Sequence, residues 1–147
     1  MRAVVTRVRE AAVLVDGETI GAIDGGLLVL LGVGPEDTEA EAAKLADKIC
    51  GLRIFEDEAG KMNWNLERAG GSLLVVSQFT LYADTRSRRP GFSHAAPPAL
   101  AEALYESFMV QCRERGFAVA HGSFGAKMAV RSENDGPVTL LLDTATP

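Results

Sequence analysis

Three polar side chains stand at the end of a short apolar run in the middle of the chain, where they could do chemistry. Residues 73–76 follow two glycines and are apolar throughout, which is typical of a strand buried on both faces. Ser77, Gln78 and Thr80 come directly after this run. A buried hydroxyl or amide without a partner costs roughly 1–3 kcal/mol, so these groups either close hydrogen bonds at the strand end or face a cavity. This segment alone favours strand-end capping.

A nucleophilic role for Ser77 or Thr80 would require a base within hydrogen-bond reach. The chain contains two histidines, His94 and His121, and neither belongs to a triad or nucleophile-elbow pattern. Its adjacent acidic residues are more typical of surface turns than of acid–base dyads. The sequence therefore shows no well-equipped side-chain catalyst.

The composition is that of a soluble globular protein, with 47% hydrophobic and 24% charged residues. We expect one domain over residues 1–147, which is enough chain to bury about 70% of its unfolded surface. No apolar run approaches the roughly 20 residues of a membrane span, and Arg7 and Arg9 interrupt any signal-peptide pattern, so a cytoplasmic location is the default. Cys50, Cys112 and the lone histidines have no metal-ligand spacing, so we predict no disulfide framework, metal or cofactor.

Positive charge is concentrated in one loop, although the net charge of the chain is −5. Arg86, Arg88 and Arg89 lie within four residues, near Asp84 and Pro90. The net charge argues against non-specific coating of nucleic acid, and charge runs are usually solvated faces. By itself the loop is a weak indication of phosphate contact.

The first half of the chain predicts several strands and one helix. Apolar runs predict strands at residues 3–5, 11–15, 19–23, 27–33 and 53–57. Asp16-Gly17 predicts a hairpin turn. Thr38 and Glu41 have capping-box spacing, so a helix should begin near residue 37 or 38 and bury Ala42, Leu45, Ala46, Ile49 and Leu52. Residues 62–71 are expected to be irregular, with Trp64 in the core.

The second half predicts another helix and the remaining strands. The strand at 73–76 is expected to continue over residues 77–81. A helix that begins at Pro97-Pro98 and ends at Gly116 would bury Ala101, Leu104, Tyr105, Phe108 and Cys112. Strands are expected at 117–120, 127–131 and 138–142, with residues 133–136 as a turn between the last two. The expected fold is α/β of the α+β type: a mixed, mostly antiparallel sheet or barrel with two packed amphipathic helices.

A second motif, near the C-terminus, changes the interpretation of the first. Residues 134–139 read Asn-Asp-Gly-Pro-Val-Thr. Ser-Gln-Phe-Thr-Leu at 77–81 followed by Asn-x-Gly-Pro-x-Thr resembles the two signature motifs of the D-aminoacyl-tRNA deacylases. The resemblance extends to residues 1–5, 26–33, 52–55 and 60–63, and so covers nearly the whole chain. Two separated motifs in the right order are far more specific than either one.

The resemblance implies hydrolysis of the ester in D-aminoacyl-tRNA, with no metal or cofactor. The terminal ribose of the tRNA carries a free hydroxyl beside that ester, which can position or activate the attacking water. The protein then needs mainly orientation and backbone N–H donors for the oxyanion. The candidates are the backbone amides of Phe79 and Thr80, with Ser77 and Gln78 positioning the substrate. Thr80 as a direct nucleophile is the second choice.

The resemblance assigns chiral selection to Gly136 and Pro137. In the family this bond is cis, and its carbonyl oxygens enter the pocket of the partner subunit, bind the substrate amino group and exclude an L side chain. The implied working unit is a homodimer, and glycyl-tRNA should be cleaved too. Asn134 belongs to the same motif, and Arg7 matches a family arginine that braces it. An aromatic residue commonly follows the motif in the family, where this chain has Leu140, a difference that concerns packing.

The resemblance also raises the value of the arginine loop, because Arg86, Arg88 and Arg89 would meet phosphates near the acceptor end of the tRNA. Two alternatives remain. A small-metabolite hydrolase on a similar scaffold would not need these arginines. A non-enzymatic interaction module would use residues 77–80 only to cap a strand.

Overall fold

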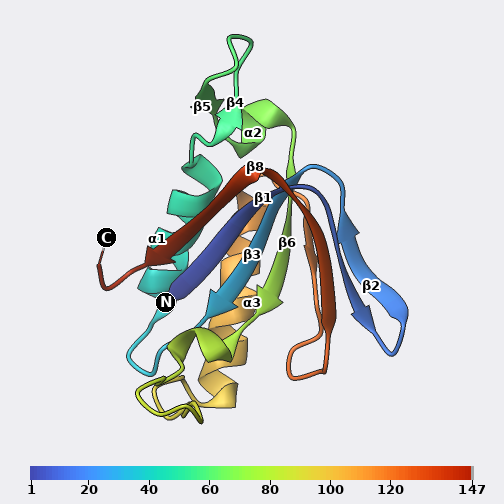
Figure 1. Ribbon diagram of the computed structural model, residues 1–147. Coiled ribbons are helices and arrows are strands. Elements are labelled where there is room, and N and C mark those ends of the chain that lie inside the picture. Colours follow the sequence, from blue (N-terminus) through green and yellow to red (C-terminus); the bar gives the residue numbers. More distant parts are fainter. Residues whose placement is uncertain (147) are drawn as a thin grey trace.

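The computed structural model describes residues 1–146, which form one main sheet, a small two-stranded arm and three α-helices (Figure 1). The main sheet has the order β2-β1-β3-β6-β7, and β8 also pairs with β1. Its strands are β1 (Arg2–Val15), β2 (Glu18–Ile23), β3 (Gly26–Gly32), β6 (Ser72–Ser77), β7 (Val119–His121) and β8 (Ala129–Asp143). The arm consists of β4 (Phe55–Glu56) and β5 (Met62–Trp64). The helices are α1 (Glu39–Gly51), α2 (Leu66–Ala69) and α3 (Pro98–Glu114).

Strand β1 organises the sheet because it is long enough to pair with three neighbours. It runs antiparallel to β8 along most of its length, and on its other side it pairs with β3 over residues 2–8 and with β2 over residues 11–15. Asp16 and Gly17 both have positive φ, at 49° and 80°, as a two-residue hairpin turn requires. The predicted hairpin is therefore confirmed, whereas the apolar runs at 3–5 and 11–15 belong to one continuous strand.

Strands β3 and β6 lie parallel in the middle of the sheet and bury both faces, as the sequence predicts. Alternate side chains point to two separate cores. One core, beneath the helices, contains Leu27, Val29, Leu31, Leu73 and Val75. The other contains Val8, Ala11, Val13, Leu28, Leu74 and Val76. A Cβ on Gly21 of β2 would lie 2.4 Å from the carbonyl oxygen of His121 in β7, so these strands approach closely and the sheet is nearly closed into a barrel.

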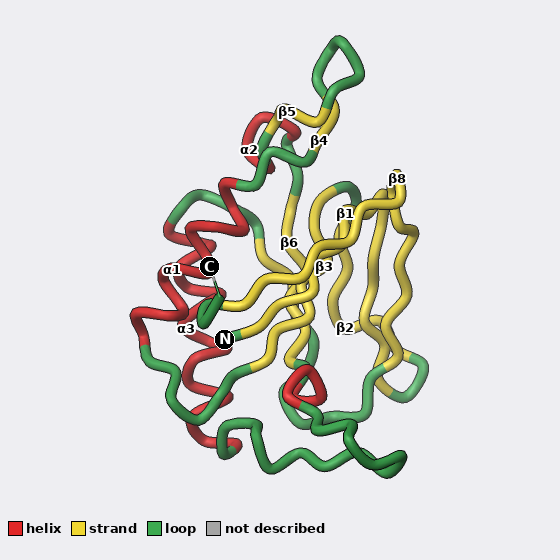
Figure 2. The backbone as a smooth tube through the Cα atoms, turned by 60° about the vertical axis from the view of Figure 1, so that its left-hand side comes forward, coloured by secondary structure: helices red, strands yellow, loops and turns green. Residues whose placement is uncertain are grey.

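Helices α1 and α3 cover the same side of the sheet (Figure 2). Thr38 caps α1 through the predicted capping box with Glu41, and Gly116, with φ +94°, follows the end of α3. The free thiols of Cys50 and Cys112 are buried where the two helices meet, with their Sγ atoms 3.8 Å apart. None of the helices in residues 1–146 combines the length and the apolar character that crossing a membrane demands. The α+β architecture with two packed helices is thus confirmed, and the short α2 adds a third helix.

Two predicted elements are wrong at the places where the signature motifs lie. Strand β6 ends at Ser77, and residues Phe79–Tyr82 form a 3₁₀ turn, η1, because Leu81 and Ala83 donate backbone hydrogen bonds to Gln78 and Thr80. Residues 133–136 do not form a turn between two strands. Both halves of β8 pair with the same long edge of β1, so the chain continues in one direction and the extra residues bulge out.

The region 53–71 also differs from the prediction. The strand expected at 53–57 covers only Phe55–Glu56, and the segment expected to be irregular contains β5 and α2. Trp64 is only partly buried, and the guanidinium of Arg68 lies 5.0 Å from its ring centroid, so Trp64 does not belong to the core. A short arm that projects beyond the sheet cannot enclose an indole (Figure 1).

Candidate functional site

The first signature motif borders an apolar cavity of about 380 Å³ at the end of β6. Ser77, Gln78 and Phe79 line one side of it. The other walls come from β3, from α3 and from two loops, and include Leu31, Phe92, Ala96, Ala101, Tyr105 and Phe124. Few water-binding groups face this space, so a substrate bound there would be largely desolvated.

The backbone of the motif is held at both ends of its turn. The N–H of Gln78 donates to the carbonyl oxygen of Leu31 at 2.8 Å, which continues the β3–β6 ladder by one bond. The first bond within the turn is donated by Leu81, so the N–H groups of Phe79 and Thr80 precede it. The Gln78 side-chain amide donates to Thr80 Oγ1. Phe79 is 57% exposed and meets Phe92 edge-on, with ring centroids 5.2 Å apart.

Within residues 1–146, no histidine or carboxylate forms a hydrogen bond with Ser77 or Thr80. His94 lies 3.7 Å from Asp84, and His121 Nδ1 lies 2.6 Å from the carbonyl oxygen of Gly122. A hydroxyl without a base is a poor nucleophile at neutral pH. The geometry therefore offers backbone donors and an amide, and supplies no side-chain base.

The second motif forms the bulge of β8. Thr139 pairs with Thr6 and Asn134 pairs with Val8, so four residues of β8, 135–138, lie opposite the single residue Arg7 of β1. The Gly136-Pro137 peptide bond within this bulge is cis, as the resemblance implies. The Asn134 side chain closes the base of the bulge, because it donates to Thr139 Oγ1 and accepts from the Val138 N–H.

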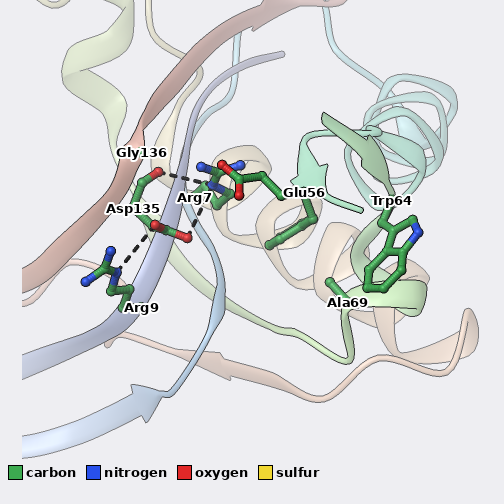
Figure 3. Close-up of a pocket in the computed structure, with 8 residues that line it drawn as sticks. Arg7, Arg9, Glu56, Trp64, Ala69, Asp135 and Gly136 are labelled. Carbon is green, nitrogen blue, oxygen red and sulfur yellow. Dashed lines mark hydrogen bonds and ion pairs between the residues drawn. The ribbon is translucent and has the colours of Figure 1, made fainter. Parts of the chain in front are cut away.

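Arg7 lies beneath the bulge and is only 4% exposed (Figure 3). Its Nε donates to the Asp135 carbonyl oxygen at 3.1 Å and lies 3.4 Å from the Asp135 carboxylate. Its Nη1 donates to the Ile54 carbonyl oxygen at 2.5 Å. Gly136 has φ +120°, and a Cβ there would lie 2.6 Å from Arg7 Nη2. The site thus requires glycine for two reasons, backbone conformation and space.

A polar pocket of about 500 Å³ lies beside this bulge (Figure 3). Arg7, Arg9, Glu56, Trp64, Asp135 and Gly136 are among the residues that line it. Sequence reasoning missed Trp64 here because it placed this residue in the core. It also missed Phe92 and Phe124 in the apolar cavity, since no local pattern signals residues that arrive from separate loops.

The two motifs do not share a cavity within one chain. Arg7 pairs with Leu27 at one end of β3, whereas Ser77 pairs with Leu31 near the other end. Four residues of a strand span roughly 13 Å. The apolar cavity and the polar pocket accordingly have no lining residue in common.

The arginine loop is closed by paired backbone hydrogen bonds between Asp84 and Gly91, of 2.8 and 2.9 Å. Arg86 is engaged by Asp84, with contacts of 2.6 to 3.0 Å. The Arg86 guanidinium and backbone N–H hold the pKa of Asp84 below its usual range, against the opposing effect of burial. Arg88 and Arg89 are exposed, and no ion pair with a residue in 1–146 engages them.

Solved structures with the same architecture define the class of fold. A protein described as c-Myc DNA Unwinding Element Binding Protein superimposes with a TM-score of 0.93 and is 43% identical, over 98% of this chain and 99% of that one. A probable eukaryotic D-amino acid tRNA deacylase superimposes with a TM-score of 0.83 over 96% of this chain and 97% of that one. Its 17% identity makes it evidence for the fold alone.

Sequence relatives then identify the family. The model of the D-Tyr-tRNA(Tyr) deacylase family matches residues 4–143. D-aminoacyl-tRNA deacylases of Roseiflexus castenholzii and Thermotoga petrophila are 60% and 57% identical, over 99% of this chain and 93% and 98% of theirs. The chain belongs to the D-aminoacyl-tRNA deacylase family, whose members are hydrolases of the ester bond in aminoacyl-tRNA. The identification made from the two motifs is confirmed.

Proposed function

We propose that this enzyme removes D-amino acids and glycine from tRNA at the η1 cavity, with the hydroxyl of the terminal ribose activating water. Family membership supports the reaction class. The observation that carries the catalytic part is the combination of an apolar cavity, free backbone amides at Phe79 and Thr80, and no base beside Ser77 or Thr80. Such amides are worth most where water is excluded, because their attraction for a developing oxyanion is then weakly screened.

Ser77 and Gln78 position the ester in this proposal, and Thr80 orients Gln78. The Gln78–Thr80 contact supports these roles, because it aims the amide of Gln78 and occupies the Thr80 oxygen. With that oxygen accepting a hydrogen bond, Thr80 is a weaker candidate for the nucleophile than the hydroxyl of the substrate.

We further propose that chirality is read across a homodimer. The bulge of β8 is too far from the η1 cavity of its own chain to line it, so Gly136 and Pro137 would enter the cavity of a second copy. The form of the sheet supports pairing of two copies. Within the described residues β8 pairs with β1 alone, and Leu141 on β8 is 79% exposed beside partly buried Val4.

Rejection of L-aminoacyl-tRNA would follow from rigid backbone. Arg7 and Asn134 hold the bulge from below and from its base, so carbonyl groups placed there cannot yield to a side chain of the wrong hand. A glycyl group has no side chain to exclude and would be accepted. Steric exclusion by a braced backbone discriminates more sharply than apolar preference, which is worth about 1–3 kcal/mol per methylene.

Arg88 and Arg89 are proposed to contact phosphates of the acceptor end. Their support is exposure without an ion-pair partner in the described chain, in a protein whose net charge of −5 repels RNA elsewhere. Arg86 is the weaker member of the three, because Asp84 already engages it. A tRNA substrate is also the basis on which we propose that the enzyme works in the cytoplasm.

The deciding experiment compares D-aminoacyl-tRNA, glycyl-tRNA, L-aminoacyl-tRNA and a free D-amino acid ester. We expect cleavage of the first two only. Equal cleavage of the L substrate would contradict chiral selection. Efficient cleavage of the free ester would indicate a small-metabolite hydrolase, and no cleavage of any substrate would indicate an interaction module.

A further inference from the structure

Arg2, the first residue of β1, contacts the 3₁₀ turn that carries the catalytic motif. Its Nη1 donates to the Leu81 carbonyl oxygen at 3.0 Å, and its guanidinium carbon lies 4.4 Å from the centroid of the Tyr82 ring. Its Nε donates to the carboxylate of Asp143, at the end of β8, at 3.0 Å. One guanidinium therefore joins the first residue of β1 and the last residue of β8 to η1.

The Tyr82 ring is an effective part of this contact because it is held in place and uncharged. Carbon atoms added at Gly32 and Gly34 would lie 3.1 to 3.2 Å from atoms of this side chain, so it packs directly on their backbone. Burial, reinforced by Asp37 and Asp143, raises the pKa of the Tyr82 phenol. The ring is therefore neutral at physiological pH, and Arg2 lies over a π face.

The turn is anchored on both sides of the two proposed oxyanion donors. Before them, Gln78 donates to Leu31 of β3. After them, Leu81 and Tyr82 are held by Arg2 of β1. Phe79 and Thr80 lie between these anchors, so their N–H directions depend on both.

We propose that Arg2 is a positioning residue for the deacylation reaction: it holds the far end of η1 so that the Phe79 and Thr80 amides point at the oxyanion. Arg2 does not line the apolar cavity, and it acts through Leu81 and Tyr82. The inference rests on the proposed role of the two amides.

The test uses Arg2→Ala and Arg2→Lys in the full-length enzyme with D-aminoacyl-tRNA. A displacement of catalytic groups by about 1 Å can reduce turnover about a hundredfold, so we expect kcat to fall about ten- to a hundredfold in Arg2→Ala. KM should change less than about twofold, because Arg2 does not touch the substrate in this arrangement. Arg2→Lys should recover only part of the loss, since an ammonium is a point charge without the planar fork.

Added guanidinium ion at millimolar concentration provides a readout that a merely structural role would not move. It should raise kcat of Arg2→Ala and leave the wild type unchanged. Leu142→Ala is the matched control, because Leu142 packs against the core beneath the helices near the end of β8. That variant should lose stability, keep kcat per folded molecule and show no rescue. Asp143→Asn, which leaves the Leu81 and Tyr82 contacts in place, should lose the least activity.

Normal kcat in folded Arg2→Ala and Arg2→Lys would overturn the inference, and so would a loss that only follows the unfolded fraction. If Arg2→Ala fails to fold, Arg2→Lys decides by the same criteria. If the wild type itself does not cleave D-aminoacyl-tRNA, the proposed function fails instead, so the two failures are distinguishable.

Discussion

The two ends of the sheet carry motifs of opposite character. At the η1 end, the motif borders an apolar cavity, and its polar groups are mainly backbone N–H groups and one side-chain amide. At the bulge end, charged residues line the pocket, and Arg7 is the one charged side chain that is buried in the described chain. The first arrangement suits stabilisation of a transient charge, and the second suits rigid support of a backbone shape. Catalysis and chiral recognition thus place different demands on the same sheet.

The largest expected effect concerns the η1 end. D-aminoacyl-tRNA that ends in 2′-deoxyadenosine should lose at least about two orders of magnitude in single-turnover rate, because the proposed activator is missing while the amides remain. Thr80→Ala with the normal substrate should retain substantial turnover. An inert Thr80→Ala, together with full cleavage of the deoxy substrate, would make Thr80 the nucleophile.

A large side chain at the bulge end should damage selection more than folding. Gly136→Val would meet Arg7 at once, and we expect about a hundredfold loss of D-specific activity because the bulge must shift. Gly60→Val is the matched control, since Gly60 also has positive φ, at +78°, but has nothing within 4 Å of an added Cβ. Deacylation rates and thermal unfolding of both variants separate the two effects.

Mixing inactive variants would sharpen the comparison between the ends. A Gly136→Val chain and a Phe79 variant should together form heterodimers with one intact site, and so recover part of the activity that each lacks alone. Full activity of a protein that is monomeric at assay concentration would contradict sharing of the site.

A smaller effect is expected from the arginine loop. Arg88→Ala combined with Arg89→Ala should reduce the slope of log K against log salt for tRNA binding by about two contacts, at roughly 0.7–0.9 per phosphate. Arg86→Ala should change that slope little, because Asp84 holds this guanidinium. Filter binding over a salt series measures all three substitutions, and an unchanged slope in the double variant would rule out the contact.

The smallest effect concerns pH. Because the folded-state pKa of Asp84 is lowered, chiefly by Arg86, its stabilisation of the loop is present above the ordinary aspartate value of about 3.9 and is lost as pH falls through the lower folded value. Carboxyl chemical shifts of Asp84 should therefore titrate below about pH 4. In Arg86→Ala the midpoint should move upward, and an unmoved midpoint would show that the pair is weak in solution.

Residue spacing determined most of the scaffold, because the elements involved depend on near neighbours in the chain. The Thr38 capping box, the Asp16-Gly17 turn and the doubly buried strands β3 and β6 all follow from local geometry and from where apolar side chains must go. The two motifs also identified the family, since their order and residues survive without any knowledge of the fold.

The tertiary structure decided how the motifs are presented. Whether residues 133–136 turn back depends on whether β1 offers one long edge to both halves of β8, and no pattern within β8 contains that information. The end of β6 at Ser77 likewise depends on Leu31 and Arg2, which belong to other strands. Phe92, Phe124 and Trp64 reach their pockets only through packing of distant segments. Sequence by itself therefore determined which residues matter and which family they define, whereas only long-range pairing decided which of them meet.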